Sequence, residues 1–88
     1  MNILKKADEI VNERSEEKEK QYGSFEIGME RSAEILTAMT GIKVDAVFMY
    51  KAMIALKLSR ESFNHKEDNL LDAVAYLGAL NNYEQSKI

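Results

Sequence analysis

The chain has 88 residues, which is enough for one domain, so we expect residues 1–88 to form a single domain. It has no cysteine, which excludes disulfides and thiolate metal sites, and its net charge of −3 argues against a general nucleic-acid binder. No apolar run reaches the roughly 20 residues of a membrane span. The first residues also lack the apolar core of a signal peptide, so we expect a cytoplasmic protein with no membrane contact.

The composition favours helix throughout. Proline is absent and there are only four glycines. Apolar residues recur at three- and four-residue spacing, which is typical of amphipathic helices. We therefore predict an all-α fold with four helices, over residues 2–20, 25–40, 46–62 and 66–83.

The first predicted helix is apolar only over its first half. Its apolar stripe stops at Val11, and every residue from 13 to 20 is polar, so the second half of the helix is solvated or faces a polar partner. One hypothesis is that the tract 13–20 makes the chain a helical protein-interaction module that blocks a host factor, although a charge run is usually a solvated face. Gly23, after Tyr22, then ends the helix.

The second predicted helix follows Ser24, a good N-cap residue, and ends at Gly41. Its spacing predicts a buried apolar face formed by Phe25, Met29, Ala33, Leu36 and Met39. Acidic residues one turn apart form a second stripe along the same helix: Glu26, Glu30 and Glu34.

The third predicted helix, capped by Asp45, is apolar nearly all round. A helix of this kind is buried on more than one side, so we expect it to be the central helix or the seam of a homo-oligomeric bundle. Before the fourth helix, Asn64 and Glu67 have the spacing of a capping box.

The turn between the third and fourth helices gathers polar side chains. If the helices are antiparallel, Lys57 lies level with about Asp72, and Arg60 lies level with about Asp68 or Asn69. His65 and Lys66 then lie at the end of the hairpin. Cross-helix ion pairs that fix the register explain this arrangement without any function, and each exposed pair stabilises the fold by at most about 1 kcal/mol.

The functional interpretation of the same turn is an anion site. Lys57, Arg60, His65 and Lys66 outnumber the local acids, arginine offers a planar fork to phosphate, and the start of the fourth helix offers free N–H groups. Asp68 and Asp72 alone are too few for a divalent-ion site built only from protein groups.

A longer pattern runs from Arg14 to Tyr76, and it is strongest from Lys57 onward. It resembles a family of small helical phage and prophage proteins of unknown function. The resemblance implies that one site gathers Arg14, Tyr22, Lys57, Arg60, His65, Asp68 and Asp72.

The segment DNLLDAVAYLGAL is also similar to the second metal helix of MazG-type nucleotide pyrophosphohydrolases. That family is all-helical, oligomeric and magnesium-dependent, and it uses Glu-x-x-Glu and Glu-x-x-Asp elements. Here the second element reads Asn69-x-x-Asp72. The resemblance implies an enzyme whose magnesium ligands would be Asp68, Asp72, Glu30 and Glu34, with Glu26 as a further candidate.

Our first expectation is a binder that needs no cofactor and sequesters a phosphorylated small molecule, a nucleotide signal, as an anti-defence protein in a phage host. Cations would grip phosphate while Tyr22 or Tyr76 stacks on the base. The predicted ligand-binding set is Arg14, Tyr22, Lys57, Arg60, His65, Lys66, Asp68, Asp72 and Tyr76. The alternative is the magnesium-dependent pyrophosphohydrolase.

Overall fold

The computed structural model describes residues 2–13, 20 and 24–87, and these residues form four helices and no strand. The helices are α1 (Ile3–Asn12), α3 (Phe25–Thr40), α4 (Ala46–Phe63) and α5 (Glu67–Gln85). The predicted all-α single domain is therefore confirmed. No helix within the described ranges is long and apolar enough to cross a membrane.

Two helices begin at the N-caps that the sequence predicts. The side chain of Ser24 accepts a hydrogen bond from the Ile27 N–H at 3.5 Å, and Asp45 accepts one from the Phe48 N–H at 2.8 Å. Helix α3 ends at Gly41, whose φ of 74° is the left-handed conformation that glycine adopts without strain. These local signals fix the limits of α3 and the start of α4.

The predicted limits of the first and last helices need correction. Helix α1 ends at Asn12, well before residue 20, because no apolar side chain after Val11 can hold a further turn against α5. Residues 14–19 lie outside the described part of the chain. Helix α5 extends past residue 83 to Gln85, because Tyr83 is buried and anchors its last turns.

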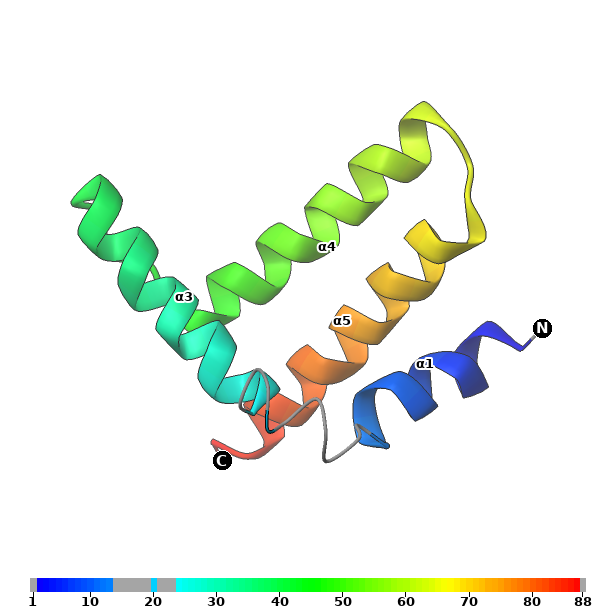
Figure 1. Ribbon diagram of the computed structural model, residues 1–88, viewed down its shortest axis with the longest axis horizontal. Coiled ribbons are helices and arrows are strands. Elements are labelled where there is room, and N and C mark those ends of the chain that lie inside the picture. Colours follow the sequence, from blue (N-terminus) through cyan, green and yellow to red (C-terminus); the bar gives the residue numbers. More distant parts are fainter. Residues whose placement is uncertain (1, 14–19, 21–23, 88) are drawn as a thin grey trace.

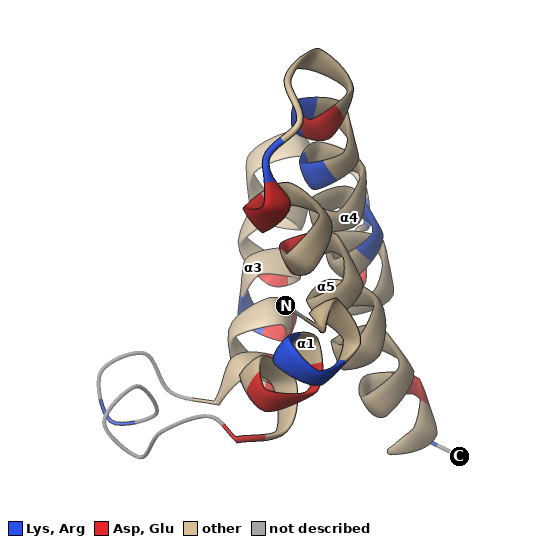
Figure 2. Ribbon diagram, turned by 90° about the vertical axis from the view of Figure 1, so that its right-hand side faces the viewer, with Lys and Arg blue, Asp and Glu red and all other residues tan. Residues whose placement is uncertain are grey.

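Helix α5 lies between its neighbours. It forms an antiparallel hairpin with α4 and packs against α1 on another side, and α3 diverges from α4 so that the two form a V (Figure 1, Figure 2). Helix α5 carries half of the buried apolar residues, whereas α4 carries only Ala46 and Tyr50. The expectation that the third helix is central is therefore not met within one chain, because much of its apolar surface remains exposed.

The interior is small. Six of the ten buried apolar residues are alanines, and the only large side chain that is fully buried among the described residues is Tyr50. The rings of Phe25 and Tyr83 lie 6.0 and 5.4 Å from the Tyr50 ring, and the Tyr76 ring lies 5.9 Å from Phe25. An aromatic cluster therefore joins α3, α4 and α5.

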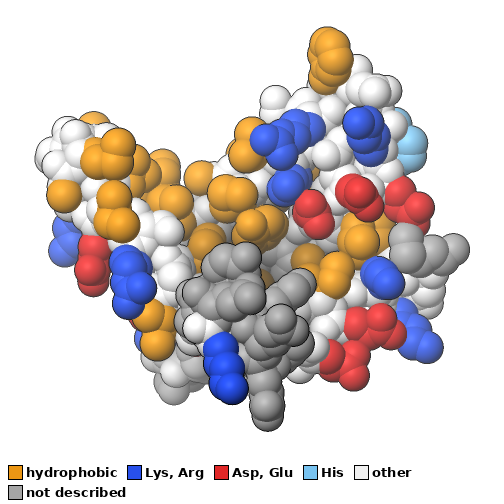
Figure 3. All heavy atoms as spheres, in the orientation of Figure 1, with side chains coloured by type: hydrophobic (Ala, Val, Ile, Leu, Met, Phe, Trp, Pro, Cys, Tyr) orange, Lys and Arg blue, Asp and Glu red, His pale blue; other side chains and the backbone are white. Residues whose placement is uncertain are grey.

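Several large apolar side chains lie outside this interior. Met39, predicted to be buried, is 77% exposed, because α3 turns away from the hairpin over its second half. The space-filling view shows apolar side chains on both arms of the V (Figure 3). The linker between α3 and α4 is held to α3 where the Thr37 hydroxyl accepts a hydrogen bond from the Val44 N–H at 2.9 Å.

Candidate functional site

A cavity of about 380 Å³ opens where α1 and the start of α3 meet the α4–α5 hairpin. Its volume lies within the ~300–1,000 Å³ typical of small-molecule sites. Its wall combines apolar, aromatic and charged side chains, and it is formed by Ile10, Val11, Phe25, Glu26, Tyr50, Lys57, Asp72, Ala75, Tyr76, Ala79 and Asn82.

Three aromatic rings from three helices form one wall of the cavity. Phe25 is the first residue of α3, Tyr50 lies one turn into α4, and Tyr76 lies in the middle of α5. Phe25 packs against both other rings at tilted angles of 60° and 46°. The wall therefore presents π surface from a set of rings that hold one another in place.

The charged part of the wall is an ion pair across the hairpin. The Nζ atom of Lys57 lies 3.1 Å from a carboxylate oxygen of Asp72, as the antiparallel register predicts. The Lys57 side chain is only 17% exposed, whereas that of Asp72 is 40% exposed. Lys57 is the only cation among the described residues that line this cavity, and Glu26 adds a second carboxylate.

The hydroxyl of Tyr50 is buried and has no hydrogen-bond partner in the described part of the chain. Burial, and after it the nearby carboxylate of Glu26, raises the pKa of Tyr50 to about 12. A buried hydroxyl left unpaired costs about 1–3 kcal/mol of folding free energy. Because Tyr50 is 0% exposed, its hydroxyl is not open to the cavity that this residue helps to line.

The neighbouring Tyr83 is satisfied by the protein itself. Its hydroxyl donates to Glu30 at 2.9 Å, and this hydrogen bond raises the pKa of Tyr83. The Nζ atom of Lys87 lies 3.6 Å from the same Glu30 oxygen and 4.9 Å from the centre of the Tyr83 ring. Glu30 is therefore already engaged by two partners.

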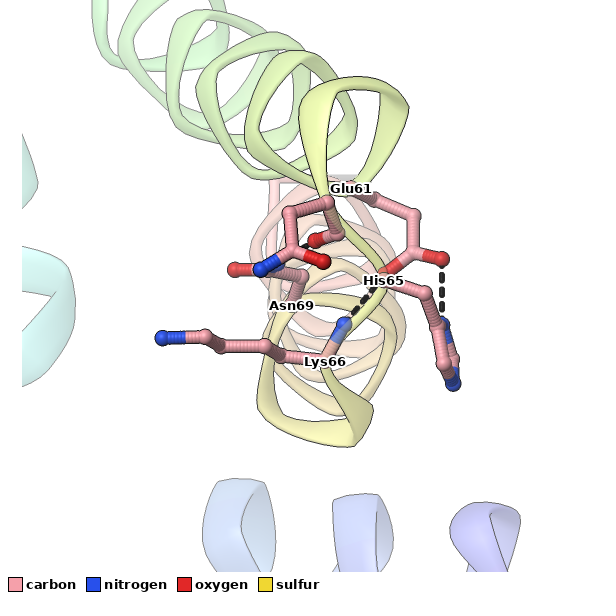
Figure 4. Close-up of polar contacts among 5 residues, drawn as sticks. Glu61, His65, Lys66 and Asn69 are labelled. Carbon is pink, nitrogen blue, oxygen red and sulfur yellow. Dashed lines mark hydrogen bonds and ion pairs between the residues drawn. The ribbon is translucent and has the colours of Figure 1, made fainter.

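The turn of the hairpin is organised by Glu61, which the sequence reasoning did not single out. One carboxylate oxygen bonds to Nδ1 of His65, and the other accepts from the Lys66 N–H at 3.2 Å (Figure 4). The hydrogen bond from His65, followed by that from Lys66, lowers the pKa of Glu61. The predicted capping box is wrong, because Asn64 is the C-cap of α4, and the N-cap of α5 is Lys66, which makes no side-chain cap hydrogen bond.

The structure brings together three of the nine predicted ligand-binding residues: Lys57, Asp72 and Tyr76 line the same cavity. Arg60 lies about one turn beyond Lys57 on α4, exposed at the surface. The other described residues of the set, His65, Lys66 and Asp68, are exposed at the end of the hairpin and do not line this cavity. Arg14 and Tyr22, like residues 14–19 of the predicted interaction tract, lie outside the described residues.

The proposed magnesium ligands do not form a cluster. Within the described ranges, no group of three or more His, Asp or Glu side chains is placed to hold a metal ion. Glu34 and Asp68 are exposed on different helices, and Glu30 is paired with Tyr83. The residues that the structure describes therefore do not fit a magnesium site within one chain.

Three of the residues that complete the cavity wall were not predicted as site residues: Phe25, Tyr50 and Asn82. A fourth, Glu26, was considered only as a further magnesium ligand. The helical spacing of Phe25 and Tyr50 predicts only that they are core residues. Glu26 read as a helix-start acid, and only its place in a stripe with Glu30 suggested more. No local pattern in the sequence brings three separate helices to one point.

The fold and the cavity define a small all-helical protein with an aromatic pocket closed at one side by an ion pair. The chain belongs to the family described as Domain of unknown function (DUF6378), whose model matches residues 2–84. No curated protein matches the chain, and no solved structure does.

Proposed function

We propose that the cavity binds a phosphorylated small molecule, a nucleotide, and that the protein sequesters it without catalysis. The observation that carries this proposal is that an aromatic wall and the ammonium group of Lys57 share one cavity. If the chain is encoded by a phage, as its sequence resemblance suggests, the ligand would be a nucleotide signal of host defence.

The aromatic wall suits a base. A nucleobase that stacks on an aromatic side chain gains roughly 1–3 kcal/mol, and the partly exposed ring of Tyr76 offers such a surface. Carboxylates of Glu26 and Asp72 can accept hydrogen bonds from amino or hydroxyl groups of the ligand.

The phosphate groups of the ligand would bind to the cationic side chains of α4. Lys57 can share its ammonium group between Asp72 and a phosphate oxygen, since an ammonium has three donors. Arg60, about one turn further along α4, makes no side-chain hydrogen bond or ion pair within the described part of the chain. It can therefore contact a second phosphate that extends out of the cavity.

The test is isothermal titration calorimetry with a panel of mononucleotides and cyclic dinucleotides. We expect at least one to bind, and Lys57→Ala to weaken that binding by about 10–100-fold, the loss of one charge-assisted hydrogen bond. Lys51→Ala is the matched control, because Lys51 is exposed on the same helix and does not line the cavity. No binding across the panel, or equal losses in both variants, would refute the proposal.

Magnesium-dependent hydrolysis, as in the MazG-type enzymes, is the second candidate. It is favoured by the two carboxylates, Glu26 and Asp72, that line the cavity with Lys57. The two functions differ in what happens to the bound nucleotide. Incubation with magnesium followed by denaturation and chromatography should return the nucleotide intact, whereas release of monophosphate and pyrophosphate would establish the enzyme instead.

A further inference from the structure

The outer face of α4 is apolar over its whole length. Its exposed apolar side chains include Phe48, Leu56 and Phe63, which are 54%, 40% and 93% exposed. Between them, the same face carries exposed small residues at helical spacing. We call these six residues the α4 stripe: Phe48, Ala52, Ala55, Leu56, Ser59 and Phe63.

The α4 stripe is symmetric about its own midpoint, which lies between Ala55 and Leu56. Each residue has a counterpart at the same distance on the other side of this point: Phe48 with Phe63, Ala52 with Ser59, and Ala55 with Leu56. Two copies of α4 packed antiparallel would place each residue opposite its counterpart. Ala55 and Leu56 would then lie at the centre, Ala52 would meet Ser59 one turn further out, and phenylalanines would meet at both ends.

The charges along α4 are compatible with this packing. No residue of the stripe is charged. The nearest exposed cations, Lys51 and Arg60, are nine residues apart, which at 100° per residue places them on opposite edges of the stripe. A second copy would therefore bury the stripe without burying either charge.

The V between α3 and α4 extends the same apolar surface. Ile35 and Met39 on α3 are 54% and 77% exposed, and apolar side chains appear on both arms of the V (Figure 3). In the antiparallel arrangement, the Phe63 end of a second α4 lies beside Phe48, at the base of the V. The most exposed phenylalanine of each chain would thus be covered by the other.

The chain exposes more surface than a compact monomer of its mass. The chain exposes 6516 Å², whereas a folded monomer of 10.0 kDa exposes roughly 5,200 Å². We propose that α4 packs antiparallel against α4 of a second copy, in a two-fold symmetric homodimer.

Sedimentation velocity of the full chain gives the first test. We expect a species of at least twice the 10.0 kDa chain mass, and a monomer for Ala55→Glu, which places two like charges together at the two-fold axis. Glutamate is a good helix former, so the helix should persist by circular dichroism. Leu77→Glu is the control, because Leu77 is an equally exposed apolar residue on α5 and should leave the association unchanged.

Cysteine cross-linking tests the orientation, since the chain has no cysteine of its own. Ala55→Cys should form a covalent dimer on oxidation. Phe48→Cys alone should not, because its two copies would lie roughly 22 Å apart along the helices, but it should cross-link to Phe63→Cys when the two variants are mixed.

A monomeric wild-type chain at tens of micromolar would overturn the proposal and leave the stripe to a different protein. Self-cross-linking of Phe48→Cys would indicate parallel packing and would also overturn it. A larger assembly that shows the expected cross-links would support it, because the α4 seam would still be present.

Discussion

Removal of the Tyr50 hydroxyl should stabilise the unliganded protein. Tyr50 is 0% exposed and its hydroxyl has no partner within the described residues, so no hydrogen bond offsets the free-energy cost of removing this hydroxyl from water. Tyr50→Phe keeps the ring and deletes the oxygen. We expect the free energy of unfolding to rise by about 1–3 kcal/mol.

Tyr83→Phe is a matched control in the same aromatic cluster. Its hydroxyl donates to Glu30 at 2.9 Å, so the same deletion removes a hydrogen bond and leaves a carboxylate oxygen with one partner fewer. Because the Glu30 side chain is 42% exposed, we expect a loss of only about 1 kcal/mol. The two substitutions should therefore shift stability in opposite directions.

Urea denaturation followed by far-UV circular dichroism measures both changes, with the protein concentration held fixed because association would shift the midpoint. In thermal scans each kcal/mol corresponds to roughly 4–8 °C for a domain of this size. If Tyr50→Phe proves as destabilising as Tyr83→Phe, the Tyr50 hydroxyl has a partner in solution and the reasoning fails. A gain in stability that is accompanied by weaker nucleotide binding would connect the hydroxyl to the ligand.

Two further predictions concern pH. The pKa of Tyr50 is raised to about 12 from an ordinary value of 10.0, so the unfolded chain releases this proton first, and the free energy of unfolding should fall as pH rises from about 10 to 12. Urea midpoints across this range should fall less steeply for Tyr50→Phe than for the wild type. An equally steep fall in both would count against the raised pKa. The pKa of Glu61 lies below its ordinary value of 4.5, so its contribution to stability is present above that pH and lost as pH falls through the lower folded value. Thermal scans between about pH 6 and 3 should show a weaker acid dependence for Glu61→Gln, and identical curves would mean that the His65 contact does not persist in solution.

The helix limits that local chemistry sets were predictable from the sequence. Helix ends are capped by Ser24, Gly41 and Asp45, and a cap depends only on the backbone groups next to it in the sequence. The Lys57–Asp72 pair was also predictable, because an antiparallel hairpin fixes which residues lie level. By contrast, the first predicted helix was too long, since helix propensity was taken to continue where packing against α5 had stopped.

The cavity itself was not predictable in the same way. Phe25 and Tyr50 belong to helices whose relative placement depends on packing over the whole chain, and their spacing alone indicates only burial. His65 was assigned to an anion site, whereas it bonds to Glu61 four residues earlier on the same side of the helix end. Contacts between distant elements depend on tertiary packing that a single sequence does not display.

The alanine-rich interior has a consequence for how much of this protein a cell would hold. Helices joined through methyl groups gain little from each contact, so the folded state has a small reserve against proteolysis. By mass action, any ligand that binds the folded form raises the free energy of unfolding in proportion to the logarithm of the ligand concentration. If the cavity binds a nucleotide as proposed, the abundance of the protein would follow the supply of that nucleotide, and unoccupied copies would be degraded first.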